Sequence, residues 1–400
     1  MFFLWFGKRT WRMESSTKSP IFFLSAAEHS GDALGAALIT ALRQEFPTAR
    51  FVGIGGDKMA AAGCRLLANP TRHSAMLLGA VKQIGYWTKL LEQVKQQFAI
   101  ERPAVVIPID SPTVNVRVAR LARRAGIGVC YYVAPQHWAW AAWRTNELRH
   151  VVDTLCCVLE FEENYFQQKG LHAVYVGHPL FDRPIAGPDA ESAQLDPPLP
   201  AGLVKLAILP GSRRAEVDAN FPVMLEVVRA VKGRFANSIF AAAAADEERA
   251  WQIRRLLQQT GTRAEVRTGA TDAIISWADL VLTVSGTATL QVARWHKPMI
   301  VLYALARWKW NLAGRFLVQT HFMSLVNILA NRELVPEFMP FYGSPAKLIQ
   351  TTLDLLNSPQ RLREMSGALE ELTAPIEVFC RQMPASRRVA LEVAKIMARK

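Results

Sequence analysis

The chain has few cysteines, and none of the spacings that would organise them into a framework. Its 400 residues include five cysteines, an odd number, and no two of them form a C-x-x-C pair. Such a set is typical of reduced thiols in a cytoplasmic protein rather than of a disulfide scaffold. A zinc site is not expected, because zinc ligands come as clustered Cys and His residues.

Long apolar runs are missing as well. No segment approaches the roughly 18 to 20 apolar residues of a membrane-spanning helix. The first residues, MFFLWFGKRTWRM, place a short apolar patch before the basic residues, which is the reverse of a signal peptide. We expect residues 1–20 to form a disordered extension, with Met13 as an alternative start. G-x-G-x-x-G is absent too, which disfavours an NAD-dependent enzyme.

Acidic residues are outnumbered by basic ones. The chain has 34 Asp and Glu against 47 Lys and Arg, for a formal charge of +13. A balance this basic favours anionic partners, namely nucleic acid, anionic lipid or a phosphorylated substrate. With 50% hydrophobic and 20% charged residues, the composition is that of a well-cored globular protein.

Short apolar runs alternate with helical patterns in two successive sets. The proline-rich stretch 182–204, which has no periodicity, separates the sets. Repeated βα units predict parallel sheets with their site at the strand C-termini, so we expect an α/β fold of two Rossmann-like domains facing a central cleft. The strands are predicted at 21–24, 50–54, 104–109, 126–133, 154–158 and 174–176, and then at 206–209, 238–243, 264–267, 280–284 and 299–302.

The domain boundaries follow from this rhythm. We predict a first domain at 21–185, a linker at 186–204 and a second domain at 205–345. The remaining residues, 346–400, read as C-terminal helices.

Residues 74–98 form a basic, aromatic and amphipathic stretch. Such a stretch can lie on an anionic bilayer, or it can be a core-facing helix with solvated lysines. The residues that would make a membrane or acyl-chain contact are Met76, Leu77, Val81, Ile84 and Trp87.

The sequence LAILPGSRRAEV at 206–217 reads as a buried strand, a tight turn and a helix start. Backbone N–H groups at a helix start attract an anion, and an arginine can clamp it bidentately. We therefore expect Arg213 to hold a phosphate; the alternative is an ordinary turn with a solvated Arg-Arg pair.

Other polar side chains also fall at predicted strand ends. Asp110 is placed to act as a general base, or else as a helix N-cap or turn residue. Glu28 and His29 are a second acid–base pair, and Trp138 and Trp140 can stack on a sugar or simply pack. The run SGTATLQ at 285–291 suits a diphosphate without needing a metal, or is a capped helix.

Taken in order, these segments resemble the lipid A disaccharide synthases, which are GT-B glycosyltransferases. No single motif is decisive, but the ordered set is specific and runs from about residue 21 to 337. The matching residues are Glu28, Ser30-Gly31-Asp32, 51–56 (FVGIGG), Asp110-Ser111-Pro112, Asn115, Trp138-Ala139-Trp140, 177–180 (GHPL), 209–213 (LPGSR), 285–290 (SGTATL) and 324–337 (SLVNILANRELVPE).

The resemblance implies an inverting transfer. UDP-2,3-diacylglucosamine gives its sugar to 2,3-diacylglucosamine 1-phosphate, forming the β-1,6 tetraacyl disaccharide 1-phosphate and UDP in lipopolysaccharide synthesis. Asp110 is the implied base and Glu28 a second catalytic group. The implied contacts to substrate or UDP are Ser30, Arg213, Ser285, Gly286, Thr287, Ala288, Thr289, Gln291, Asn327 and Arg332. No metal or other cofactor is expected.

The implied partners are the two acylated sugars and an anionic membrane surface, with no nucleic acid. The implied location is the cytoplasmic face of the inner membrane. The family includes C-terminally swapped dimers, so residues 346–400 either cross back to the first domain or exchange within a homodimer.

The chain departs from the family pattern at a few positions. Thr113 and Gln291 replace acids, Ala27 replaces glycine, and Ala304 stands where a basic residue is common. Two alternatives therefore stay open. One is a catalytically weakened paralogue that binds a UDP-sugar or lipid. The other is a GT-B enzyme or UDP-sugar epimerase that uses a soluble sugar.

Overall fold

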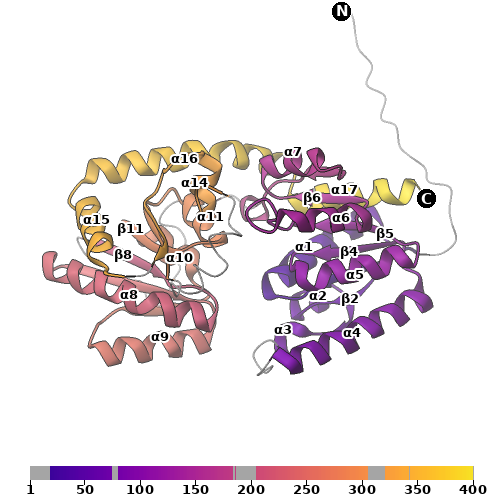
Figure 1. Ribbon diagram of the computed structural model, residues 1–400, viewed down its shortest axis with the longest axis horizontal. Coiled ribbons are helices and arrows are strands. Elements are labelled where there is room, and N and C mark those ends of the chain that lie inside the picture. Colours follow the sequence, from indigo (N-terminus) through magenta and orange to yellow (C-terminus); the bar gives the residue numbers. More distant parts are fainter. Residues whose placement is uncertain are drawn as a thin grey trace, which may run out of the picture.

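The computed structural model describes residues 19–73, 80–182, 185, 204–304, 320–341 and 343–399. Within these residues the chain forms two parallel sheets, each with helices on both faces (Figure 1). The α/β fold of two Rossmann-like domains is therefore confirmed. The predicted extension, up to residue 18, and the linker, up to residue 203, lie outside the described residues.

The first domain contains a sheet of seven strands in the order β3-β2-β1-β4-β5-β6-β7. Its strand β1 alternates sides: Phe22 and Leu24 pack in one buried cluster, and Phe23 packs in another. Burial on both faces explains why these strands read as continuous apolar runs. The strands are β1 (Ile21–Ala26), β2 (Arg50–Ile54), β3 (Cys64–Ala68), β4 (Val105–Ile109), β5 (Gly128–Tyr132), β6 (Thr154–Cys157) and β7 (Ala173–Tyr175).

The helices of this domain follow the apolar spacing of the sequence. In α5, Val114, Val118 and Ala122 are buried at a four-residue spacing, while its arginines face solvent. The helices are α1 (His29–Glu45), α2 (Asp57–Ala61), α3 (Pro70–His73), α4 (Ala80–Glu101), α5 (Pro112–Arg124), α6 (Thr145–Val151) and α7 (Glu160–Gln168), with short 3-10 turns η1 (Ala142–Arg144) and η2 (Pro179–Phe181).

The second domain repeats this plan with strand order β10-β9-β8-β11-β12-β13. Its strands are β8 (Val204–Leu209), β9 (Ser238–Ala244), β10 (Glu265–Thr268), β11 (Leu280–Val284), β12 (Met299–Ala304) and β13 (Glu337–Phe341). Its helices are α8 (Arg214–Arg234), α9 (Glu247–Thr260), α10 (Thr271–Trp277), α11 (Thr287–Arg294), α14 (Leu325–Ala330) and α15 (Ala346–Leu356).

Two edge strands were not predicted. β3 (CRLLA) is half-exposed along most of its length, and β13 (EFMPF) contains a proline and no fully buried side chain. Edge strands need less apolar sequence than central ones, so neither produced the run that marked the others.

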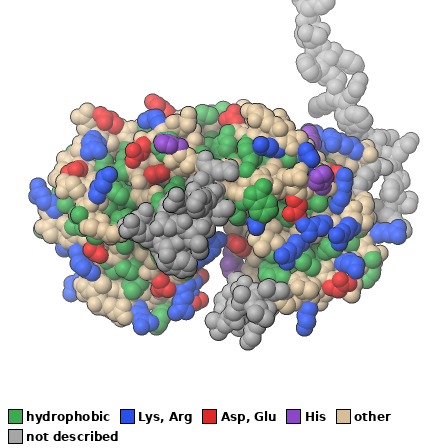
Figure 2. Space-filling view, in the orientation of Figure 1, with side chains coloured by type: hydrophobic (Ala, Val, Ile, Leu, Met, Phe, Trp, Pro, Cys, Tyr) green, Lys and Arg blue, Asp and Glu red, His purple; other side chains and the backbone are tan. Residues whose placement is uncertain are grey.

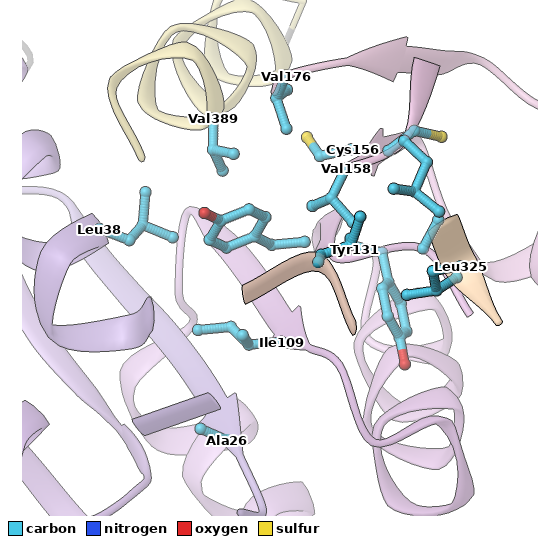
Figure 3. Packing of buried hydrophobic residues seen from close by; sticks show 14 of the residues in the cluster. Ala26, Leu38, Ile109, Tyr131, Cys156, Val158, Val176, Leu325 and Val389 are labelled. Atoms are coloured by element: carbon cyan, nitrogen blue, oxygen red, sulfur yellow. The ribbon is translucent and has the colours of Figure 1, made fainter. Parts of the chain in front are cut away.

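The C-terminal helices return to the first domain of the same chain. α16 (Pro359–Gln382) runs along the second domain, and α17 (Ala385–Ala398) then packs on the first, as Figure 1 shows. Figure 3 shows Val389 of α17 near Leu38 of α1, and Leu325 of the second domain within the same buried cluster. One apolar core therefore joins the two domains.

The crossing is held where α16 meets η2. Gly177 has a φ of 87°, and a Cβ at this residue would meet the Cys380 Sγ at 2.9 Å, so glycine permits the close approach. Beside it, Asp182 Oδ1 accepts the Ala385 N–H at 2.9 Å and caps α17. Burial raises the pKa of Asp182 to about 6, although the Ala385 N–H and Arg388 act in the opposite direction.

The amphipathic stretch predicted at 74–98 is confirmed as a helix from residue 80 onward. Residues 74–79 lie outside the described residues, and α4 continues to Glu101. Leu90, Val94 and Phe98 are buried against the sheet, so this half is core-facing and the predicted membrane contact cannot include it. In the described part of the chain, no helix is both long and apolar enough to cross a bilayer.

We predict that Asp182→Asn stabilises the protein at pH 8 but not at about pH 4. A folded-state pKa above the unfolded value means that this group's contribution to stability is lost as pH rises through about 6. Asparagine keeps the side-chain oxygen that accepts the capping hydrogen bond but carries no buried charge. Asp182→Ala removes that acceptor and should lower the free energy of unfolding by about 1 kcal/mol. Thermal denaturation at both pH values measures this, with Asp246→Asn at the exposed cap of α9 as the matched control. An equal effect of Asp182→Asn at both pH values would contradict the prediction.

Candidate active site

A cavity of about 700 Å³ lies between the two domains. The first domain lines it with Glu28, Asp110 and Trp140, and the second with Arg213 and Thr287. A larger pocket, of about 1210 Å³, lies beside β9, α9 and β10 and contains none of the predicted site residues. The cavity between the domains is therefore the candidate site.

Asp110 lies at the end of β4 in a backbone conformation that is rare for residues other than glycine. The φ angles of Asp110 and Ser111 are 52° and 44°. Asn115 holds this turn, since its Nδ2 donates to the carbonyls of Ile109 at 2.8 Å and Asp110 at 2.7 Å. Tyr131 Oη donates to the same Asp110 carbonyl at 2.8 Å. Strained residues persist where their surroundings over-determine them, often at functional sites.

The carboxyl of Asp110 is suited to accept a proton. Burial raises its pKa above the ordinary value, and a hydrogen bond from the Ser111 backbone only partly offsets this. The negative charge of Glu28 raises the same pKa, and Arg213 lowers it. Ser111 is the N-cap of α5, so Asp110 is not; Asp110 does lie in the turn before the helix, which was the other alternative.

Arg213 and Glu28 face each other across the cavity. Arg213 Nη2 lies 3.6 Å from Glu28 Oε2, and its Nη1 lies 3.1 Å from Glu216 Oε1. The Arg213 side chain is 68% exposed, so its ion pairs are weak and an incoming anion can compete for the guanidinium.

The predicted backbone cradle at the start of α8 is partly occupied by a side chain of the same turn. Glu216 Oε2 already accepts the N–H groups of Ser212 and Arg213, at 3.1 and 3.2 Å. Gly211, with φ of 117°, leaves the space that the Glu216 side chain fills. Two of the N–H groups at this turn are therefore already bonded, while the Arg213 side chain is exposed to an anion.

The 285–289 loop is only partly available to a ligand. Gly286 and Thr287 line the cavity at the start of α11, and Ala288 is half-buried beside them. Ser285 Oγ donates to the Met323 carbonyl at 3.1 Å. Thr289 is fully buried and its Oγ1 donates to the Gly286 carbonyl, so its predicted side-chain contact with UDP is not available.

Gln291 is paired with an acid that was not singled out from the sequence. Its Nε2 donates to Asp272 Oδ1 at 2.9 Å, and Trp295 Nε1 donates to the same oxygen at 2.8 Å. The carboxylate that the family pattern has at position 291 is thus replaced by an amide that holds a neighbouring carboxylate.

Asn327 does not face the cavity, contrary to the prediction of a donor contact. It is fully buried; its Oδ1 accepts the Leu334 and Val335 N–H groups, and its Nδ2 donates to Glu337. It thereby joins α14 to β13. Arg332 is exposed in the turn after α14 and does not line the cavity.

The remaining predicted residues are placed as follows. Ser30 is exposed in the first turn of α1 and does not line the cavity. Trp87 lines it, edge-on to Tyr86 at 5.3 Å between ring centroids. Met76 and Leu77 lie outside the described residues, as do the side chains of Val81 and Ile84.

Glu162, which lines the cavity, has a role that was not predicted from the sequence, and His178 of the GHPL motif lines the cavity as well. Glu162 accepts the Trp138 Nε1–H at 2.9 Å and two backbone N–H groups, so Trp138 packs rather than stacks on a ligand. Burial raises the pKa of Glu162 to about 7 and lowers that of His178 to about 4. His178 is therefore neutral near pH 7.

Solved structures with this architecture include sugar-nucleotide enzymes. A UDP-N-acetylglucosamine 2-epimerase from Listeria monocytogenes matches with a TM-score of 0.62 and 12% identity, covering 88% of this chain and 91% of that one. The calicheamicin glycosyltransferase CalG4 matches with a TM-score of 0.57 and 14% identity, covering 96% and 99%. The fold is therefore GT-B.

Sequence comparison identifies the family. The family described as lipid-A-disaccharide synthetase matches residues 22–384. The lipid-A-disaccharide synthase of Alcanivorax borkumensis is 31% identical over 389 residues, covering 96% of this chain and 100% of the relative. The chain belongs to the lipid-A-disaccharide synthetase family and is a hexosyltransferase of lipid A biosynthesis.

We predict that Glu28→Gln moves the acid limb of the pH–rate profile to lower pH. Asp110 must be ionised to act as the base. The negative charge of Glu28 raises the pKa of Asp110, so removing that charge should lower this pKa. Arg213→Gln should move the limb to higher pH, because it removes a charge that lowers the pKa. The profile of kcat/KM between about pH 4 and 8 measures both shifts. Glu226→Gln, on the exposed side of α8, is the control; a shift of the Glu28→Gln limb to higher pH would refute the coupling.

Restoring the acid of the family pattern with Gln291→Glu should destabilise this protein. The new carboxylate would replace a donor 2.9 Å from Asp272 Oδ1, at a cost of about 1–3 kcal/mol. The loss should grow as pH rises, because one of two adjacent carboxyls is protonated more readily. Urea denaturation measures it. Asp272→Asn/Gln291→Glu, which reverses donor and acceptor, should recover most of the loss; without recovery the pairing would not be the cause.

Proposed function

We propose that this protein transfers the 2,3-diacylglucosaminyl group of UDP-2,3-diacylglucosamine to 2,3-diacylglucosamine 1-phosphate with inversion. A sugar hydroxyl of the acceptor forms a bond to the anomeric carbon while the bond from that carbon to the diphosphate oxygen breaks. The observation that carries the proposal is one cavity with a raised-pKa carboxyl on one side and an exposed guanidinium on the other. The lipid-A-disaccharide synthases among its relatives supply the substrate class.

Asp110 acts as the base in this proposal. A carboxylate positioned at a hydroxyl takes its proton as the new bond forms, and a raised pKa makes it a better acceptor. The strained turn aims the side chain from the end of β4, and Asn115 and Tyr131 prevent the turn from relaxing.

Arg213 and the start of α11 take the leaving group. Negative charge accumulates on the diphosphate as the sugar departs, and a guanidinium with a helix N-terminus stabilises it without a metal or cofactor. The diphosphate displaces Glu28 from Arg213. This exchange is inexpensive because both partners of the pair are more than half exposed, at 55% and 68%.

The protein acts on the cytoplasmic face of the inner membrane as a peripheral enzyme. Both proposed substrates are acylated, and Trp87 lies at the cavity on α4. The preceding part of the 74–98 stretch, with Met76, Leu77, Val81 and Ile84, supplies the apolar contact for the acyl chains in this proposal.

Release of UDP from the two purified diacyl substrates in detergent tests the proposal. We expect turnover that depends on both substrates. Asp110→Asn should abolish it and leave UDP affinity nearly unchanged, whereas Arg213→Ala should weaken UDP binding by about 1.5–3 kcal/mol. Intact UDP binding by the unmodified protein with no UDP release would refute the enzyme assignment. A soluble sugar acceptor that works as well as the acylated one would refute the lipid substrate.

A further inference from the structure

The loop between β5 and α6 exposes two tryptophans. Trp143 is 71% exposed and Trp140 is 39% exposed, which is unusual for such large rings. The Arg144 guanidinium lies over both, 5.2 Å from the Trp143 ring centroid and 5.6 Å from that of Trp140. The loop thus presents an indole surface with a fixed positive charge beside it.

A recess next to Trp143 is lined by cations without acids. Its volume is about 600 Å³, and Arg149 and Lys169 line it together with the polar side chain of Asn146. No Asp or Glu belongs to its lining within the described residues. Such a recess suits an anionic, phosphate-bearing group.

The helices beside this loop carry the same sign of charge. α4, α5 and α6 together contain eight Lys and Arg against three Glu. Figure 2 shows Lys and Arg side chains gathered over these helices on one face of the first domain. Arg120 and Arg123 pair with Glu147 and Asp153, whereas Arg117 and Arg124 are exposed and the described residues offer them no ion pair.

The same loop also lines the active-site cavity. Trp140 lines that cavity together with Trp87 of α4. Trp143 is three residues further along the chain and is more exposed. A bilayer bound at Trp143 would therefore lie near the active-site cavity.

We propose that Trp143, Arg144 and the arginine-rich face of α5 dock the first domain on an anionic lipid bilayer, as a contact separate from the 74–98 stretch. The inference rests on the proposed function, whose substrates are membrane lipids. Indole rings favour the interface between headgroups and acyl chains, and basic residues beside them bind anionic headgroups.

A second exposed indole, Trp251, lies in different surroundings. Trp251 of α9 is 62% exposed and also lies under an arginine, Arg255, at 5.6 Å. The recess beside it, however, includes the acids Asp218 and Glu248. Trp143 and Trp251 therefore match in exposure and stacking but differ in the charge around them, which makes Trp251 the control.

Co-sedimentation of the full-length protein with vesicles tests the indole. With phosphatidylglycerol–phosphatidylcholine vesicles, Trp143→Ala should lower the partition coefficient about tenfold, equivalent to about 1.4 kcal/mol. Trp251→Ala should change it less than about twofold. Equal binding by Trp143→Ala and the unmodified protein would overturn the proposal, and so would equal losses in both variants.

Charge reversal tests the electrostatic part. Arg117→Glu/Arg124→Glu should reduce binding to anionic vesicles at least about tenfold at low salt, since each basic residue near such a surface contributes about fivefold. The difference should shrink at high salt and disappear on pure phosphatidylcholine. Arg229→Glu/Arg263→Glu, an exposed pair on the second domain, is the matched control. Equal losses in both double variants would show an effect of net charge only. They would refute the proposed bilayer contact through the arginine-rich face of α5.

Activity separates this inference from the proposed function. In detergent micelles Trp143→Ala should release UDP at the rate of the unmodified protein, whereas on vesicle-embedded substrates its rate should fall with its binding. If the unmodified protein binds vesicles through Trp143 but never releases UDP, the proposed function fails and the docking face stands. If UDP release is normal on vesicles in both tryptophan variants, the docking face fails and the function stands.

Discussion

The turn at Asp110 and Ser111 is the constraint on which the site depends. Two consecutive residues with positive φ cost about 1–3 kcal/mol each, and they persist because Asn115 and Tyr131 bind the backbone on both sides of Asp110. Asn115 is itself fixed by Ser25 Oγ, which donates to its Oδ1 at 2.7 Å from the adjacent strand β1. The position of the Asp110 carboxyl is thus set by hydrogen bonds within the first domain.

The charges across the cavity are coupled through one guanidinium. Arg213 is shared by Glu28 and Glu216, while Glu28 and Arg213 act in opposite directions on the pKa of Asp110. In the proposed reaction, a diphosphate that neutralises Arg213 weakens the influence that lowers this pKa, so that Asp110 becomes a stronger proton acceptor. Donor binding on one domain then favours the proposed base on the other, and the ion pair between Arg213 and Glu28 is the contact that the donor replaces.

Much of the fold was accessible from sequence because both sheets are covered on both faces. All eleven predicted strands have counterparts, and most of them are apolar runs ended by a turn. The half-exposed edge strands β3 and β13 were missed, although β10, an edge strand of similar exposure, was predicted. Within the site, sequence placed Asp110, Glu28 and Arg213 at strand ends. It could not show that Glu216 occupies the turn before α8 or that Asn327 is turned toward Glu337. Those outcomes depend on side-chain partners that are chosen only when the chain has folded.

The departures from the family pattern look different once their neighbours are known. Gln291 lacks the usual charge, but it and Trp295 bind one oxygen of Asp272, so a carboxylate remains in that corner of the second domain. Thr113 lines the cavity just after the strained turn. Because Thr113 carries no charge, Glu28 is the carboxylate that raises the pKa of Asp110, together with burial. Neither substitution replaces Asp110, Arg213 or a residue of the turn at Asp110 and Ser111. These two changes therefore alter the surroundings of the reaction centre and leave its parts in place, which favours an active transferase over a paralogue that only binds.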